Sequence, residues 1–468
     1  MAATDTTTHP ERALTGLEET IEGAFLRPDD GHYAAARALW NGLIDHRPAV
    51  IAQVQNGDDV ATALLRGREA GLEIAVRCGG HSVSGQSMSQ GGLTIDLSQM
   101  NRVDVDPVAC TAKVGGGSLL MDVAKAGEPH GLAMPFGLIS HTGVGGLTLG
   151  GGIGWLMRKY GLALDRLRSL QVVTAEGAQV TASELENPDL FWALRGGGGN
   201  FGIVTEFEYD LCAYGPLALS GIVLHRYEDA GDVMRFSREF METAPDELTV
   251  FEVFLTVPPH DPFPAELQGK LGFGLGMAYA GPIAEGEKVA APLREYGNPA
   301  LDLVGPMPTT ALQTMIDDSS PHGINGYDRA HWLAELPDEA VDTMVELFAD
   351  VPSPMSLLLN ARMGGAVERV AADATAFGHR DCHRLLWIVG QWFEGGLEEQ
   401  RAWIERVYEA MKPYSDGAVY VNALGDEGEE RVRAAYEDAV WARLTEAKCR
   451  WDPDNVFRLN QNIKPTSA

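Results

Sequence analysis

The sequence is poor in cysteine, and the few cysteines that it has are scattered. There are five among 468 residues, and no two of them form a CxxC pair. An odd number without paired spacing fits neither a disulfide framework nor a zinc site, and it suits a reducing compartment. We therefore expect no bound metal and a cytoplasmic location.

Positive charge is also scarce. Lys and Arg number 36 against 66 Asp and Glu, which gives a formal net charge of −30 at pH 7. Nucleic acid and anionic membrane surfaces would repel such a chain, so neither is an expected partner. No apolar run reaches the roughly 20 residues that a membrane-spanning helix needs. The N-terminus also lacks the basic start and apolar core of a secretory signal.

Glycine, by contrast, is abundant. The 54 glycines exceed a tenth of the chain and gather in short runs without a period. This distribution excludes a collagen-like repeat and indicates loops in which the backbone approaches a ligand closely. The length of 468 residues favours two domains over one hydrophobic core.

The N-terminal half is predicted to alternate short strands with helices after a polar tail. Leu14, Leu17, Ile21 and Phe25 are spaced for one apolar face of a helix. Strands are expected at 49–54, 73–82, 92–100 and 110–118, and a helix with an Asp N-cap at 58–69. Several strands end in glycine-rich turns, which predicts a mixed α and β domain with glycine loops on one side.

Beyond Tyr214 the pattern changes to longer strands. Antiparallel strands are expected at 220–225, 247–257, 269–280, 356–364 and 383–393, with helices at 229–242, 337–349 and 398–411. One amphipathic helix is expected at 426–449, closed by an Asp-Pro stop. The whole chain is thus predicted to be of the α+β class.

The segment RCGGHSVSGQS at 77–87 carries the most chemical information. Two glycines, a His and small hydroxyl residues after a strand present several backbone N–H groups to one point, which suits a diphosphate without any lysine. It is neither a Walker loop nor a GxGxxG dinucleotide motif. Taken alone, the segment is more typical of a tight β-turn than of a ligand site.

Four further segments give this loop a context. They are GLISHTGVGGLTLGGGIGWLMRKYGLALD (137–165), NPDLFWALRGGGGNFGIVTEFEY (187–209), YVNALGDEGEERV (420–432) and WDPDNVFRLNQNIKP (451–465). Together with RxGGHS they resemble the FAD-linked oxidases of the vanillyl-alcohol-oxidase and para-cresol-methylhydroxylase (PCMH) fold. The berberine-bridge-enzyme-like branch, which includes 6-hydroxy-D-nicotine oxidase, is the nearer match. The resemblance runs from about residue 45 to 466.

The resemblance implies a two-domain PCMH-type FAD-binding fold with an inserted substrate domain, an antiparallel sheet flanked by helices. A tail and helix at 1–40 would precede an FAD-binding domain at 41–214. Residues 215–415 would form the substrate domain, and residues 416–468 would return to the FAD domain.

In the family, the His of RxGGHS is the attachment point of the flavin 8α-methyl group, so His81 is the implied covalent ligand. Many relatives add a second link through a Cys in GxCxxxGxGG. Ile139 occupies that position here, which excludes the second link and predicts FAD held by an 8α-histidyl bond alone. The residue before GxGG gates oxygen in relatives, and the small Thr142 favours an oxidase over a dehydrogenase.

The same resemblance distributes cofactor contacts over the loops. The implied cofactor-binding residues are His81, Arg77, Cys78, Gly79, Gly80, Ser82, Gly85, Thr142, Gly143, Gly145, Gly146, Gly150, Gly154, Gly202, Ile203, Asn422, Asn460 and Asn462. The last two are expected to anchor a C-terminal strand beside the FAD domain.

The segment Tyr420-Val421-Asn422-Ala423 departs from the family at one position. Sugar oxidases and plant relatives place a catalytic Tyr where Ala423 stands. Without that base, an amine that donates hydride from its neutral form is favoured over a sugar, and an already acidic phenol or enol also qualifies. Tyr420, Asn422 and His141 are the predicted catalytic residues, although a backbone carbonyl could equally hold His141.

Four residues of the middle domain are predicted to bind substrate, since its sheet roofs the flavin in this fold. They are Asn360, Arg362, Gln391 and Trp392. Strand alternation puts Asn360 and Arg362 on one face, and Trp392 could instead belong to the core.

The predicted reaction is hydride transfer from a small organic substrate, an amine or a secondary-metabolite C–H, to flavin N5 and then to O2, giving H2O2. The alternatives are an oligosaccharide or alcohol oxidase, a flavin-N5-oxide oxygenase of natural-product biosynthesis, and a flavin-binding protein without activity. A monomer or a homodimer is expected.

Overall fold

The N-terminal half of the chain builds two small sheets. In the computed structural model, which describes residues 21–381 and 383–466, the first sheet has the strand order β1(Ala24–Leu26), β2(Val50–Gln53), β4(Leu93–Asp96), β3(Ile74–Arg77). Strands β2, β4 and β3 are parallel. Helix α3(Gly57–Glu69) makes the crossover from β2 to β3, which run parallel in this sheet on either side of β4, and parallel strands need such a connection.

The second sheet is antiparallel, and its strand β10 shows a clear alternation of buried and more exposed side chains. Its order is β5(Val103–Asp106), β6(Thr111–Gly115), β10(Ile203–Asp210), β8(Leu167–Val173), β9(Gln179–Ser183). On β10 the buried Phe207 and Tyr209 alternate with the more exposed Glu206 and Glu208, so one face of this sheet joins the core. A two-stranded ribbon, β7(Leu132–Ala133) with β11(Cys212–Ala213), lies beyond it.

Short helices connect these strands and carry the glycine loops. They are α2(Tyr33–Ala36), α4(Leu120–Gly127), α5(Val144–Gly150), α6(Met157–Tyr160) and α7(Pro188–Leu194).

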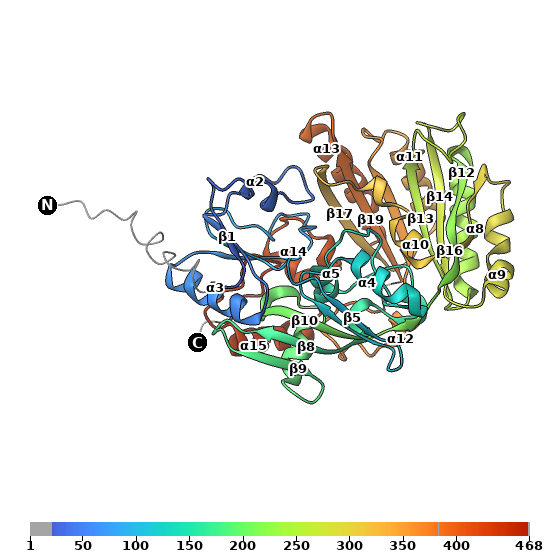
Figure 1. Cartoon of the computed structure of the whole chain (residues 1–468). Coiled ribbons are helices and arrows are strands. Elements are labelled where there is room, and N and C mark those ends of the chain that lie inside the picture. The colour runs from blue at the N-terminus through green and yellow to red at the C-terminus, as the bar shows by residue number, and fades with distance from the viewer. Residues whose placement is uncertain (1–20, 382, 467–468) are drawn as a thin grey trace.

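The middle of the chain forms one antiparallel sheet of eight strands, set beside the N-terminal half (Figure 1). Its order is β15(Leu301–Asp302), β12(Leu217–Arg226), β14(Leu271–Tyr279), β13(Leu248–Thr256), β18(Leu357–Arg362), β19(Arg384–Trp392), β17(Asn325–Leu333), with β16(Gly305–Pro308) also paired to β12. Helices α8(Ala230–Thr243), α9(Ile283–Glu295), α11(Asp338–Phe348) and α13(Leu397–Met411) pack on one face of it. The short helices α10(Thr309–Thr314) and α12(Ala366–Arg369) lie in its connections.

The C-terminal residues return to the N-terminal half through α14(Glu429–Ala434) and α15(Asp438–Trp451). Helix α15 packs beside α7, where Arg450 and Trp451 both contact the Asp189 carboxylate. The fully buried Lys448 ammonium donates to the carbonyls of Asn200 and Phe457 and to Asp452. On these contacts we propose the division into an FAD domain of 41–214 with 416–468 and a substrate domain of 215–415.

Several predicted elements need correction. Residues 1–20 lie outside the described residues, and the end of the helix predicted there is a strand, β1, because it pairs with the edge of β2. The N-cap of α3 is Asn56, whose side chain accepts from the Asp59 N–H. The helix predicted at 426–449 is broken at 435–437, and the chain near Asn460 and Asn462 is not a strand. Strand β17 and helix α9 were missed.

Two findings concern the predicted location of the protein in the cell. In the described part of the chain no helix combines the length and apolarity needed to cross a bilayer. Cys78, Cys110, Cys212 and Cys449 are free thiols. The cytoplasmic location stays a prediction.

Replacing Lys448 with Ala should lower the free energy of unfolding by roughly 3–5 kcal/mol, because it leaves the buried Asp452 carboxylate without its cation. Denaturant unfolding of the variant measures this. Lys412→Ala, which removes an exposed pair, serves as the control. Equal decreases in the free energy of unfolding of the two variants would contradict the interpretation that Lys448 anchors the C-terminal segment to the first domain.

Candidate functional site

A cavity of about 410 Å³ lies between the glycine loops and the eight-stranded sheet. This volume falls within the range of small-molecule and cofactor sites. Three loop segments, within 78–87, 138–149 and 197–204, supply one side of the cavity. Strands β13, β17, β18 and β19 supply the opposite side, here called the roof, and residues 420–424 and 457–461 complete the wall.

The first two glycine loops touch each other through their backbones. A Cβ added at Gly79 would lie 2.3 Å from the backbone nitrogen of Gly143, and one added at Gly143 would lie 2.3 Å from that of Gly79. Any side chain at either position would therefore separate the loops. Gly80 follows with φ of +71°, a left-handed conformation that favours glycine. The loop thus turns its next residue, His81, into the cavity.

The cavity wall offers unfilled space and unsatisfied polar atoms to a ligand. Gly146 and Gly199 both line it, and a Cβ at either would meet no protein atom within 4 Å. Ser87 Oγ, Gln391 Oε1 and Asn460 Oδ1 are buried there without a hydrogen-bond partner. Buried polar atoms of this kind normally have partners. These residues fit FAD, whose diphosphate would meet backbone N–H groups and hydroxyls, because the lining residues include no Lys or Arg.

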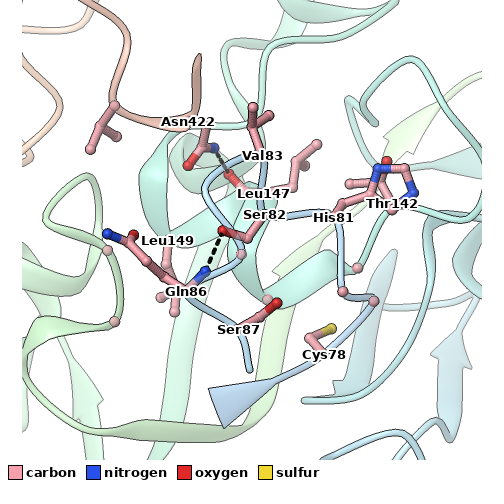
Figure 2. Close-up of a pocket in the computed structure, with 18 of the residues that line it drawn as sticks. Cys78, His81, Ser82, Val83, Gln86, Ser87, Thr142, Leu147, Leu149 and Asn422 are labelled. Atoms are coloured by element: carbon pink, nitrogen blue, oxygen red, sulfur yellow. Dashed lines mark hydrogen bonds between the residues drawn. The ribbon is translucent and has the colours of Figure 1, made fainter. Parts of the chain in front are cut away.

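His81 is held from two sides. Its ring stacks on Trp40, with centroids 5.2 Å apart and planes at 19°. Its Nε2 lies 2.6 Å from Nδ1 of His141, so one proton is shared between these nitrogens. Burial, and then the neighbouring His141 and His322, hold the pKa of His81 well below its usual value. The ring is therefore neutral and keeps a nucleophilic lone pair. Figure 2 shows His81 and Thr142 next to each other and Asn422 across the pocket.

Folding brings three histidines together that no sequence motif links. The ring nitrogens of His81, His141 and His322 lie within 4.8 Å of one another, a grouping that could hold a metal ion. Two ligands of one tetrahedral ion with metal–nitrogen bonds of about 2.0–2.1 Å would stand roughly 3.3 Å apart. The 2.6 Å between His81 and His141 is a hydrogen-bond distance instead. We therefore interpret His81 and His141 as a hydrogen-bonded pair, with the His322 ring centroid 4.5 Å from that of His141.

Tyr420 and Asn422 form a fixed pair beside α5. Asn422 Nδ2 donates to the carbonyl of Leu147 and to the Tyr420 hydroxyl, each at 3.0 Å (Figure 2 shows the first). The Gly152 N–H donates to the same hydroxyl at 3.1 Å. Burial raises the pKa of Tyr420, so this residue stays neutral. A Cβ at Gly150 would lie 2.0 Å from Asn422 Oδ1, which explains the glycine there.

The roof corrects three of the four predicted substrate residues. Gln391 lines the cavity, together with Leu357, Leu359, Leu385, Trp387 and Val389. Asn360 and Arg362 do share a face, as alternation predicted, but it is the opposite one. There Asn360 contacts the Glu252 carboxylate and Arg362 pairs with Glu242. Trp392 is buried away from the cavity.

Most residues predicted to bind the cofactor line the cavity. They are Cys78, Gly79, Gly80, His81, Ser82, Thr142, Gly143, Gly145, Gly146, Gly202, Ile203, Asn422 and Asn460. Those outside the lining are Arg77, Gly85, Gly150, Gly154, Asn462 and the predicted catalytic His141.

Three of these outer residues support the loops from behind. Arg77 donates to the carbonyl of Ala36 and lies near Asp96. Gly85 makes room for Ile44, and Gly154 lies against the Phe136 carbonyl. Contacts within the protein therefore account for the two glycines and for the position of the Arg77 side chain.

Asp328 on β17 is a lining residue that the sequence reasoning missed. Its carboxylate accepts from Trp387 Nε1 at 3.1 Å and from the Gly390 N–H at 3.3 Å. Burial raises its pKa to about 7, while the two hydrogen bonds act in the opposite direction. The signal was the alternation of GYDRAHWL, which places Asp328 on one face with Ala330 and Trp332.

Comparison with known proteins also indicates FAD as the cofactor. Residues 48–183 match the FAD binding domain family, and residues 419–464 match the family described as berberine and berberine like. The chain is 31% identical to an uncharacterized FAD-linked oxidoreductase, YgaK, of Bacillus subtilis, over 96% of this chain and 98% of the relative. It is 29% identical to (R)-6-hydroxynicotine oxidase of Paenarthrobacter nicotinovorans, with 96% and 98% covered.

Solved structures show the same fold. The crystal structure of 6-hydroxy-D-nicotine oxidase from Arthrobacter nicotinovorans superposes with a TM-score of 0.86 at 27% identity, and the match covers 97% of this chain and 99% of that one. The sequence-based expectation of a two-domain PCMH-type fold is confirmed. Because two family models match and a relative is 31% identical over nearly the whole chain, this chain belongs to the FAD-linked oxidoreductases of the berberine-bridge-enzyme-like family.

Proposed function

We propose that this FAD-dependent oxidoreductase is an oxidase of small organic molecules whose flavin is tethered through His81. The observation that carries the proposal is the central cavity, with glycine loops on one side and an apolar roof on the other. When bound, FAD would supply the acceptor for a hydride from a substrate C–H bond and the carrier of its electrons to O2. The loops bind it, and the roof leaves room for a substrate against it.

The tether rests on the state of the His81 ring. A neutral imidazole offers the lone pair that a bond to the flavin 8α-methyl group needs, and burial keeps the ring neutral. Stacking on Trp40 and the hydrogen bond to His141 fix its orientation. Ile139 lines the cavity where a second attachment residue would stand, so the proposed link is single.

The roof supports an amine or a secondary-metabolite substrate. Leu357, Leu359, Leu385 and Val389 make most of it apolar, whereas a sugar needs many polar partners, since unpaired buried hydroxyls are costly. The related enzyme from Paenarthrobacter nicotinovorans oxidises, by its name, (R)-6-hydroxynicotine. Thr142 lines the cavity as a small residue, which supports reoxidation by O2 to H2O2.

A panel of amines, phenols and alcohols tests this function. Each compound is added anaerobically to the purified protein, and bleaching of the flavin absorbance identifies substrates. Air is then admitted and H2O2 is measured. The proposal expects bleaching by amines or phenolic compounds and one H2O2 per flavin reoxidised. Bleaching by oligosaccharides alone, or reoxidation without peroxide, would contradict it.

Filling the space at Gly146 should weaken FAD binding. A valine there would project into the cavity, where no protein atom lies within 4 Å of the added Cβ, and overpacking of about 1–3 kcal/mol corresponds to roughly 5- to 150-fold in affinity. The FAD-to-protein ratio of purified Gly146→Val measures the loss. Gly31→Val, also in open space but outside the cavity, is the control and should keep the wild-type ratio.

His81→Ala should release the flavin on acid denaturation. In the unaltered protein the yellow colour should stay with the precipitated polypeptide, because the bond survives unfolding. In the variant it should pass into the supernatant as free FAD. His130→Ala, outside the cavity, should behave as the unaltered protein. Free FAD from the unaltered protein would refute the tether.

A further inference from the structure

Four residues that line the central cavity carry a group able to exchange a proton: Cys78, His81, Asp328 and Tyr420. Asp328 is the only carboxylic acid among the lining residues, and it is 4% exposed. The sequence places no base at 423, so a substrate that must lose an N–H or O–H proton needs a proton acceptor elsewhere in this wall.

Three of the four groups are unsuited to accept a proton near neutral pH. Burial raises the pKa of Cys78 to about 11 and also raises that of Tyr420, so both hold their protons. The Tyr420 hydroxyl already accepts from Gly152 and Asn422. His81 is hydrogen-bonded to His141 and is the proposed flavin ligand.

Asp328 is oriented by the roof itself. Trp387 donates its indole N–H to Oδ2, and Gly390 donates its backbone N–H to Oδ1, both from the adjacent strand β19. Trp387 in turn lies against Tyr420, with ring centroids 6.3 Å apart. The carboxylate is thus fixed in the roof next to the Tyr420–Asn422 pair, with lone pairs left for a substrate donor.

The charged neighbours of Asp328 along β17 point the other way. Arg329 pairs with Glu405 and Glu427, and the Tyr327 hydroxyl donates to Glu405, all on the α13 face of the sheet. From β19, the groups that contact the carboxylate are an indole and a backbone amide, both uncharged. In the described part of the chain no ion pair of Asp328 is formed with a cation, which leaves the carboxylate basic.

We propose that Asp328 is the general base of the oxidation, a role that rests on the proposed oxidase function. Its carboxylate takes the proton from the substrate N–H or O–H. The electron pair of that bond becomes the second bond of C=N or C=O, while the hydrogen on the adjacent carbon leaves with the electron pair of its C–H bond as hydride, for which bound FAD would be the acceptor. The hydride, the proton and O2 together make H2O2, so electrons and atoms balance.

Asp328→Asn tests the base by its pH profile. With a substrate found in the panel, the anaerobic rate constant of flavin reduction should rise with pH to a plateau through an apparent pKa of about 7, because the ionised carboxylate is the active form. Asn should lower the plateau rate constant by about 10²–10⁴-fold, the usual contribution of a general base. It should also abolish the rise of the rate constant with pH, here called the rising limb. The substrate dissociation constant should change little. Asp232→Asn, far from the cavity on α8, should match the wild type.

Trp387→Phe is a second variant with a distinct signature. The indole hydrogen bond lowers the pKa of Asp328, so its loss should move the limb to higher pH while a plateau is still reached. This result keeps the test decisive if Asp328→Asn folds poorly.

Thermal unfolding provides a readout that needs no substrate. The folded-state pKa of Asp328 lies near 7, above the roughly 3.9 of an unfolded chain. Between these values the unfolded state releases its proton first, so the wild type loses stability as pH rises. The Tm of Asp328→Asn minus that of the wild type should therefore grow from about pH 4 to 7 and then stay constant.

The outcomes separate the two proposals. If no compound bleaches the wild-type flavin, the proposed oxidase function fails and the base falls with it. If the wild type is reduced but Asp328→Asn keeps its rate and its limb, or changes only substrate affinity, the oxidase function stands and the base is refuted. A Tm difference that does not vary with pH would likewise count against the base.

Discussion

The backbone contact between Gly79 and Gly143 is the constraint on which the rest of the site depends. One loop follows β3 and the other leads into α5, and their backbones approach so closely that neither glycine position has room for a Cβ. That contact sets His81 on one side of the cavity and the segment from Thr142 to Leu149 on the other. A single side chain here would move the proposed attachment point away from the surface that receives the flavin.

The eight-stranded sheet serves two different environments with its two faces. Leu386 and Ile388 of β19 face the helices, with Trp403 and Ile404 of α13, while Leu385, Trp387 and Val389 face the cavity. The helix face also holds a buried charged group, Glu252 with Arg384 and Asn360. The cavity face holds a single carboxylate without a cation. The alternation of side chains along these strands therefore places the paired charges of Glu252 and Arg384 on the helix face. It places the unpaired carboxylate of Asp328 on the cavity face.

The sequence was sufficient for the family, the fold class and the glycine loops, because those depend on local residue types in a fixed order. It was sufficient for the shared face of Asn360 and Arg362, since alternation is local. It could not say which face meets the flavin, because that depends on how the sheet is set against the first domain. Asp328 was missed for a related reason: its role needs Trp387, 59 residues away in the chain. The three histidines also meet only through folding.

The C-terminal return has a consequence for how the protein is made. Leu424, Phe457, Leu459, Asn460 and Gln461 complete the cavity wall, and Lys448 fastens that segment to Asn200. A nascent chain from which residues 457–461 have not yet emerged lacks this part of the wall. Without residues 457–461 the cavity stays open on this side, so we expect the chain to hold its cofactor firmly only after that segment has folded back onto the first domain.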